Sequence, residues 1–273
     1  MSLVEITGYV GAALIGVSLG LIGSGGSILT VPVLVYLIHI EPVLATAYSL
    51  FVVGISALLG GISYARKKLV SYKTAIVFAI PAFIAVYLTR LWVVPALPPT
   101  WFHIGSFTLT KDVGILLLFA VLMLFASVGM IRNGKIGNES KVEEVVPRFN
   151  FPMILLEGTV VGVLTGLVGA GGGFLIIPAL VLFAKLPMKM AVGTSLFIIA
   201  AKSLIGFIGD VQAEQPIDWS FLLIFSAIAA SGIFLGGYLS NFVKGHKLQK
   251  SFGWFVLVMG VFMIVKELFL ADV

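Results

Sequence analysis

The stretch GLIGSGGSILTVP, residues 20–32, and its copy GLVGAGGGFLIIP, residues 166–178, decide how this chain is expected to fold. Both stretches lie inside long apolar runs, and the first holds four glycines within its first seven residues. Glycine clusters of this density break or unwind a helix. At membrane depth, the backbone groups that such a break frees must be buried in protein or line a wet cavity. Two breaks at matching positions of two halves therefore predict a ligand site between them.

Composition places the chain in a membrane. Of its 273 residues, 60% are hydrophobic and 11% are charged, which excludes an ordinary soluble domain. The chain has no cysteine, which excludes disulfides, thiolate metal sites and a catalytic thiol. The net charge of +5 comes from basic residues in short loops between apolar runs. These are typical of membrane topology signals. We therefore expect a lipid bilayer as partner, and no nucleic acid, metal or cofactor.

The apolar runs predict an all-α polytopic protein of about ten hydrophobic segments. Five precede a hydrophilic linker and five follow it: residues 8–22, 27–38, 43–64, 74–94 and 113–131, then 151–168, 174–184, 188–208, 219–242 and 252–270. The first and second segments are each too short to cross about 30 Å of hydrocarbon comfortably at about 1.5 Å per residue, and the sixth and seventh are the corresponding short pair of the second half. They predict broken or re-entrant helices at the glycine motifs. The expected organisation is a first repeat at 1–132, a cytoplasmic linker at 133–149 and a second repeat at 150–273.

An internal repeat links the two halves. A shift of 146 positions aligns residues 20–51 with residues 166–197 without a gap. The identical pairs include Gly23 with Gly169 and Pro32 with Pro178, which chance matches of apolar residues do not explain.

The loops predict that the second repeat is inverted. The loop at residues 66–73 is basic, whereas its repeat partner at residues 210–218 is acidic. Basic loops are enriched on the cytoplasmic side, and an odd number of segments per half is what inversion requires. With the basic loops inside, both chain termini are expected on the non-cytoplasmic face. Inverted repeats with broken helices are the architecture of many secondary transporters.

The glycine motifs predict an anion site. A half-helix that begins inside a membrane presents free N–H groups and a partial positive charge. The residues expected to contact the anion are, in the first motif, Gly23, Ser24, Gly25, Gly26 and Ser27, and in the second, Gly169, Ala170, Gly171, Gly172 and Gly173. Because hydroxyls occur in the first copy alone, the site should be asymmetric. The alternative is that these glycines only allow helices to pack closely.

Two ionisable residues lie within predicted spans. Lys202 is a candidate for anion pairing or gating, because a charge in a span is functional by default. Its alternatives are snorkelling to the outer interface and a salt bridge with Asp210. Glu157 could carry a coupling proton if burial favours its neutral form, or it could be an interfacial carboxylate.

Hydroxyl groups begin the third segment of each repeat beside the glycine breaks. These are Tyr48 and Ser49 in the first half, and Thr194 and Ser195 in the second. They can line a polar cavity and bind substrate. Alternatively, they bond back to carbonyls of their own helix.

The paired motifs, together with the run AVGTSL at residues 191–196, resemble the TauE/SafE sulfite exporter family, over nearly the whole chain. The resemblance implies transport of sulfur-containing anions, such as sulfite or organosulfonates including sulfoacetate, across the bacterial inner membrane. It also implies that residues 23–27 and 169–173 flank the substrate. The two copies differ at Tyr48, which corresponds to Thr194, and at Ser56, which corresponds to Lys202.

The expected function is therefore a secondary transporter that moves a small anion by alternating access, and not an enzyme. A coupling proton or other ion and a homo-oligomeric assembly are both compatible with the sequence. Two other classes stay open. A passive anion channel would share the site, and an intramembrane serine hydrolase would need Lys202 as the base for Ser24, since the histidines lie outside the predicted spans.

Overall fold

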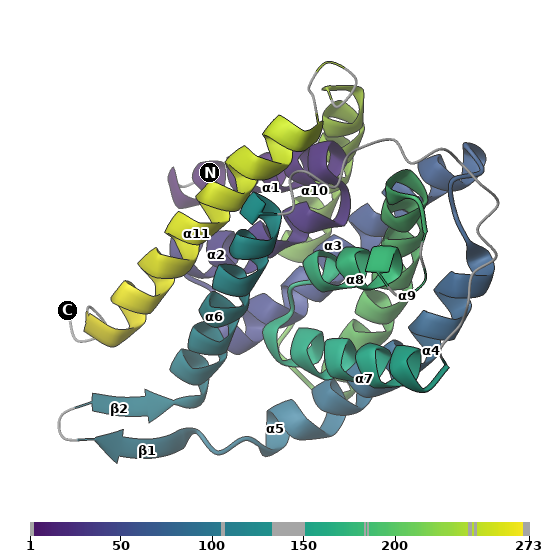
Figure 1. The fold of residues 1–273 in the computed structure, drawn as a ribbon. Coiled ribbons are helices and arrows are strands. Elements are labelled where there is room, and N and C mark those ends of the chain that lie inside the picture. The colour runs from purple at the N-terminus through teal and green to yellow at the C-terminus, as the bar shows by residue number, and fades with distance from the viewer. Residues whose placement is uncertain are drawn as a thin grey trace.

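The computed structural model describes residues 3–104, 107–132, 151–182, 184, 186–239, 242 and 245–269. The chain is mostly helical (Figure 1). Up to the central linker its elements are α1 (Leu3–Ile22), the 3₁₀ helix η1 (Gly23–Leu29), α2 (Thr30–Pro32), the π-helix η2 (Val33–Leu37), α3 (Pro42–Arg66), α4 (Tyr72–Leu88), the π-helix η3 (Thr89–Val93), α5 (Val94–Ala96), β1 (Thr100–Ile104), β2 (Phe107–Thr110) and α6 (Lys111–Arg132). After the linker come α7 (Phe151–Val168), α8 (Gly173–Leu182), α9 (Met188–Gln212), α10 (Trp219–Leu239) and α11 (Gly245–Phe269).

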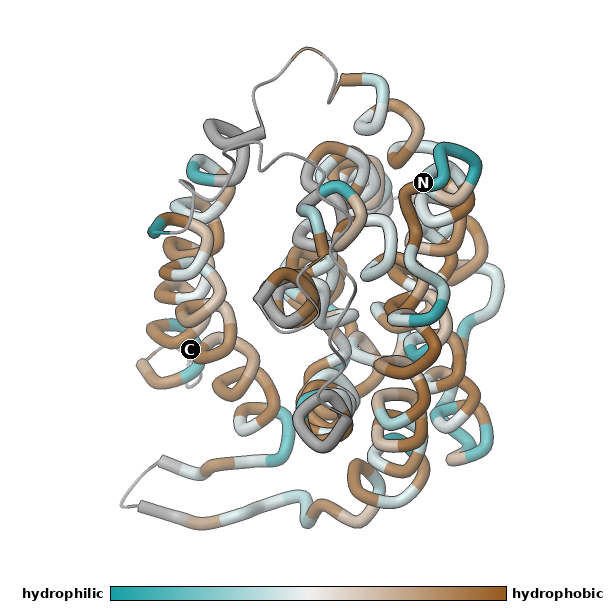
Figure 2. The backbone as a smooth tube through the Cα atoms, turned by 45° about the vertical axis from the view of Figure 1, so that its right-hand side comes forward, coloured by the Kyte–Doolittle hydropathy of each residue, from teal (hydrophilic) through white to brown (hydrophobic). Residues whose placement is uncertain are grey.

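The prediction of a polytopic membrane protein is confirmed. In the described part of the chain, 6 helices are long and apolar enough to cross a membrane. Three shorter apolar helices accompany them, at Ile6–Leu21, Gly26–Leu37 and Leu155–Val168. Hydrophobic residues line the helices along most of their length (Figure 2). Many of these side chains point outward, including Ile76, Ile80 and Ile84 on α4, where lipid is the expected neighbour.

Two features differ from the predicted segments. The loop between the fourth and fifth segments contains a β-hairpin, in which β1 pairs antiparallel with β2, so the chain is not entirely α-helical. Phe102 of β1 lies opposite Leu109 of β2, a pairing that the Pro- and Trp-rich composition of the loop did not indicate. The first helix begins at Leu3, earlier than the predicted residue 8. The predicted linker at 133–149 lies outside the described residues.

Glycines lie at the contacts between two pairs of helices and allow their backbones to approach closely. α1 lies along α10, and α7 lies along α4. An added Cβ at Gly20 would be 2.2 Å from the carbonyl oxygen of Ile233, and one at Gly162 would be 2.4 Å from that of Ala82. No side chain fits at such distances, so these glycines set the helix spacing. Gly20, the first residue of the first motif, therefore allows close packing of two helices, which was the alternative to a role in ligand binding.

The central pair, α3 and α9, is antiparallel. Gly54 contacts Leu204, whereas Gly61, further along α3, contacts Phe197, which comes earlier in α9. The loop that follows α3 is hydrogen-bonded to the first part of α9, and the loop that follows α9 is hydrogen-bonded to the first part of α3. The Ser71 N–H donates to the Thr194 hydroxyl at 3.0 Å, and the Asp218 N–H donates to the Tyr48 hydroxyl at 2.7 Å.

The helix directions place the beginning of α1 and the end of α11 on one face. α1 and α10 run parallel, because Tyr9 stacks on Phe221 and Gly20 meets Ile233. α10 begins where α9 ends, so α1 begins on the face opposite the basic loop at 66–73. α6 and α11 run antiparallel, since Gly253 contacts Ile131 and Gly260 contacts Leu124. α11 therefore ends on the same face as the beginning of α1.

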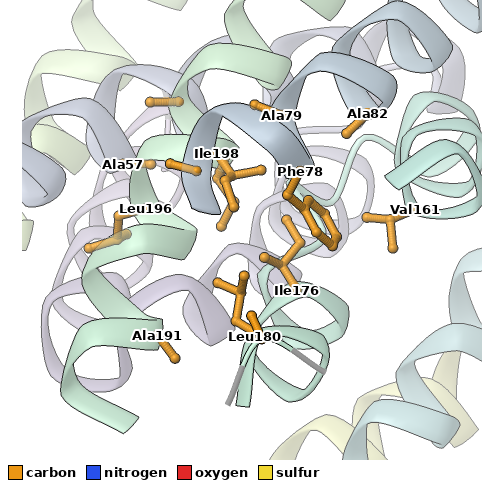
Figure 3. Close-up of a cluster of buried hydrophobic side chains, with 14 of the residues drawn as sticks. Ala57, Phe78, Ala79, Ala82, Val161, Ile176, Leu180, Ala191, Leu196 and Ile198 are labelled. Atoms are coloured by element: carbon orange, nitrogen blue, oxygen red, sulfur yellow. The ribbon is translucent and has the colours of Figure 1, made fainter. Parts of the chain in front are cut away.

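The short helix α8 is embedded in protein. Its side chains Ile176 and Leu180 are buried in a cluster with Phe78 of α4, Val161 of α7 and Ile198 of α9 (Figure 3). The 10-residue helix α8 is thus packed on three other helices through these two side chains.

Candidate functional site

The second glycine motif interrupts the helical backbone. α7 ends at Val168 and α8 begins at Gly173, and the turn between them has φ values of +74° at Gly169, +65° at Gly171 and +68° at Gly172. L side chains rarely adopt these angles, which explains the glycines. The first motif behaves differently, because residues 23–29 continue α1 as a 3₁₀ helix. The copies are alike in sequence but not in backbone conformation.

Two buried serines hold this turn in place. Ser27 Oγ donates to the carbonyl of Ala170 at 2.7 Å, and Ser49 Oγ donates to that of Gly169 at 2.7 Å. Both side chains are fully buried. Carbonyls freed by a helix break need such partners in an apolar interior. Ser27 belongs to the first motif, so the two motifs are in direct contact, as the repeat predicts for a shared site.

Lys202 lies against the same turn. It is 0% exposed, and its Nζ donates to Thr165 Oγ1 at 2.7 Å. An added Cβ at Gly172 would be 3.1 Å from that Nζ. Among the described residues, no carboxylate lies within salt-bridge distance of Lys202, so the two alternatives, snorkelling and pairing with Asp210, do not describe this structure. A buried ammonium beside a glycine turn is a suitable partner for an anion.

Asp210 pairs instead with Arg90. Arg90 Nη1 is 3.3 Å from Asp210 Oδ1 and donates to Thr46 Oγ1 at 3.0 Å, and the Arg90 side chain is 0% exposed. Arg90 was not among the candidate site residues predicted from the sequence, so this contact was missed. The signal was present, since Arg90 lies inside the apolar run 74–94 and an intramembrane charge requires a partner.

The other predicted hydroxyls have structural partners. Tyr48 and Thr194 accept the loop N–H groups described above. Ser195 Oγ donates to the Val192 carbonyl at 2.8 Å, as the back-bonding alternative predicts. These three groups are buried. Glu157 lies on α7, half-buried, and its Oε2 has no hydrogen-bond partner within the described chain.

The remaining predicted site residues belong to the first glycine motif. Gly26 packs tightly, since an added Cβ would be 2.5 Å from the Leu19 nitrogen. Gly23 and Gly25 lie on the 3₁₀ helix, and the side chain of Ser24 lies outside the described residues. The structure thus gathers Ser27, Ser49, Lys202 and the turn at 169–173 into one buried polar cluster, which we call the crossing site.

Comparison with known proteins identifies related sequences along nearly the whole chain. The sequence model of the family described as sulfite exporter TauE/SafE matches residues 9–263. A probable membrane transporter protein of Xylella fastidiosa (strain 9a5c) is 29% identical over 258 residues, covering 92% of this chain and 91% of that protein. The probable membrane transporter protein YunE of Bacillus subtilis (strain 168) is 28% identical over 261 residues, covering 90% and 89%. No solved structure matches the chain.

The match to the family extends from α1 to α11 and includes both glycine motifs and Lys202. The chain therefore belongs to the TauE/SafE sulfite exporter family of membrane transporters.

Proposed function

We propose that the protein is a secondary carrier of a small sulfur-containing anion, an organosulfonate or sulfite, and that the anion binds at the crossing site. The observation that carries this proposal is Lys202, which is fully buried and held by a hydroxyl instead of a carboxylate. Burying a charge without a counter-ion is strongly unfavourable. A site that accepts a substrate anion explains why such a lysine is kept there. An added Cβ at Gly172 would be 2.3 Å from Thr165 Cγ2 and 3.1 Å from Nζ, so glycine at this position lets the turn lie directly against both side chains.

The turn supplies the remaining recognition. The N–H groups of Gly169 and Gly172 already donate to the carbonyls of Thr165 and Ala170, so the group proposed to attract the anion is the start of α8 at Gly173. N–H groups at a helix start favour negative charge. Ser27 and Ser49 act mainly by holding the turn, because their hydroxyls donate to its carbonyls. Gly23, Ser24 and Gly25 of the first motif, and Tyr48, Thr194 and Ser195, belong to the proposal as surroundings of the substrate's path.

The helix pairing supports alternating access between two inverted five-segment repeats. α1 with α10 and α4 with α7 are corresponding pairs under the repeat, and α3 lies antiparallel to α9. The two loop contacts, from Ser71 to Thr194 and from Asp218 to Tyr48, also correspond. Because the two halves are equivalent, each can adopt the conformation that the other has. This exchange of conformations would open the site to each side of the membrane in turn. Its buried position in this structure corresponds to a closed state.

We place the carrier in the bacterial inner membrane with the basic loops in the cytoplasm and both termini outside. The excess of Lys and Arg in the loop at 66–73, on the face opposite both termini, supports this orientation. A cysteine introduced into this cysteine-free chain tests it directly. In spheroplasts, a membrane-impermeant maleimide should label Glu214→Cys and spare Lys68→Cys, and the reverse pattern would overturn the orientation.

Transport itself is tested in proteoliposomes. Vesicles preloaded with sulfoacetate, sulfite, isethionate or acetate are diluted into buffer with a trace of the same radiolabelled anion. A carrier accumulates label transiently by counterflow and saturates with concentration. A channel lets the label equilibrate without an overshoot, and no anion-dependent flux at all would contradict the proposal. Lys202→Met should remove the overshoot while the exposed Lys189→Met, on the same helix, keeps it.

Coupling to protons is proposed through Glu157. Its Oε2 is buried and has no hydrogen-bond partner among the described residues, so the carboxyl group is available to take up and release a proton. In vesicles with an imposed pH gradient, Glu157→Gln should lose gradient-driven uptake and keep counterflow exchange. Equal gradient-driven uptake by Glu157→Gln and the wild type would remove Glu157 from the coupling step.

A further inference from the structure

Arg90 is a second buried cation beside the crossing site, and its contacts use only part of its hydrogen-bonding capacity. Its Nη1 contacts Asp210 and Thr46, while its Nε and Nη2 have no partner among the described residues. Asp210 Oδ2 is also buried and unpartnered there. A guanidinium that serves only to hold helices together would be expected to bind the carboxylate through two parallel N–H groups. This pair uses one contact, at 3.3 Å.

The chain connects Arg90 to the turn of the crossing site. Thr89, the preceding residue, lies against Gly166, and the backbone of Thr46 lies against Gly169. Arg90 itself sits in the π-helical turn η3, a form of helix that is rare and occurs often at functional sites. The polar groups around Arg90 therefore continue the polar cluster around Lys202.

The two cations lie at different depths. Asp210 follows Lys202 by eight residues on α9, which places it about 12 Å further along the helix. That direction leads to the face opposite the basic loops. An anion that enters from this face would meet Arg90 first and Lys202 second.

We propose that Arg90 is a second substrate-binding residue that selects oxyanions, through its free Nε and Nη2 edge. This edge presents two parallel N–H donors, which match two oxygens on one centre, as in a sulfonate, sulfite or carboxylate. The ammonium of Lys202 is a point charge without this preference. Asp210 balances the charge of Arg90, so that the anion is recognised and still released. The inference rests on the proposed function, because it concerns the path of the same substrate.

The first test replaces the paired N–H donors of the Arg90 guanidinium with a lysine ammonium, which keeps the positive charge. Purified wild type and Arg90→Lys are titrated with sulfoacetate, acetate and chloride, and the apparent affinities are obtained from thermal stabilisation. The ratio of oxyanion to chloride affinity should fall by about tenfold or more in Arg90→Lys, since one charge-assisted hydrogen bond is lost. An unchanged ratio would show that Arg90 is a structural residue.

The second test predicts a gain, which a misfolded protein would not produce. Asp210→Asn removes the competing carboxylate and keeps its shape, so sulfoacetate should bind several-fold more tightly than to wild type. Glu214→Gln is the matched control, since it makes the same charge change at an exposed position on the same face. A purely structural ion pair predicts a lower starting stability for Asp210→Asn and no gain in affinity, which overturns the inference.

The outcomes separate this inference from the proposed function. Unchanged selectivity in Arg90→Lys, together with no gain in Asp210→Asn, overturns the role of Arg90 and leaves the Lys202 site intact. Absence of stabilisation of the wild type by every anion in the panel overturns both.

Discussion

Replacing Gly169 with alanine tests whether the turn of the crossing site depends on glycine. The added Cβ would lie 2.4 Å from the carbonyl oxygen of Thr46 and 2.6 Å from its Cα. Both are backbone atoms of α3, so no side-chain rotation can relieve the contact. The residue also has a φ of +74°, which alone disfavours alanine by about 1 to 2 kcal/mol.

The two effects together predict severe destabilisation. Real Cβ atoms do not approach backbone this closely, so α3 or the turn must move, and overpacking of this kind adds about 1 to 3 kcal/mol. A total of roughly 2 to 5 kcal/mol corresponds to a fall in Tm of at least about 4 °C. The movement would also disturb the hydrogen bond from Ser49 to the Gly169 carbonyl.

The measurement is thermal unfolding of the purified variant in detergent, followed by tryptophan fluorescence and by recovery of monodisperse protein. Gly129→Ala in α6 is the control, because its Cβ would meet nothing within 4 Å. That control should unfold at or slightly above the wild-type temperature, as alanine favours a helix by about 0.5 to 1 kcal/mol over glycine. A Gly169→Ala protein with wild-type Tm and wild-type transport would refute the conformational argument.

Three further predictions follow from the same contacts. Ser49→Ala leaves the buried Gly169 carbonyl without its donor and should destabilise the protein by about 1 to 3 kcal/mol in the same unfolding assay, whereas the exposed Ser231→Ala should have no measurable effect. Thr165→Val keeps the side-chain shape but removes the acceptor of Lys202, so it should lower the starting Tm and enlarge the shift produced by a bound anion; an unaltered Tm would mean that Lys202 does not need this partner. Gly162→Leu should prevent α7 from packing on α4, because its Cβ alone would be 2.4 Å from the Ala82 carbonyl oxygen, and it should reduce the yield of folded protein far more than Gly129→Leu; equal yields would contradict the packing described for these helices.

The sequence was a good guide to the class and to the crossing site because two signals were strong. Apolar length predicts membrane helices, and repeated glycines in an apolar run predict a broken backbone. Together they led to Gly169, Gly171 and Gly172, whose positive φ values account for their identity. Lys202 was found by a third signal, a charge within a span. The inverted arrangement remains a prediction that the helix pairing supports.

Other features could not be predicted from one sequence because they depend on tertiary contacts. Tyr48 and Thr194 follow the glycine breaks in sequence, but their hydroxyls receive N–H groups from loops of the opposite half. The two motifs also take different backbone conformations, since Gly26 packs against α1 itself while Gly169 packs against α3. The contact of Arg90 was not predicted because its partner, Asp210, lies 120 residues away in sequence.

The most direct test of the account is anion-dependent stabilisation of wild type, Lys202→Met and Lys189→Met, measured side by side. Both variants lose one positive charge from α9, but Lys202 is fully buried and Lys189 is exposed. The panel contains sulfite, sulfoacetate, isethionate, taurine, sulfate, acetate and an uncharged control. A bound ligand raises Tm in a saturable way. The account predicts that a sulfonate or sulfite raises the Tm of wild type and Lys189→Met but not that of Lys202→Met. An equal shift in all three proteins would contradict the claim that Lys202 binds the transported anion.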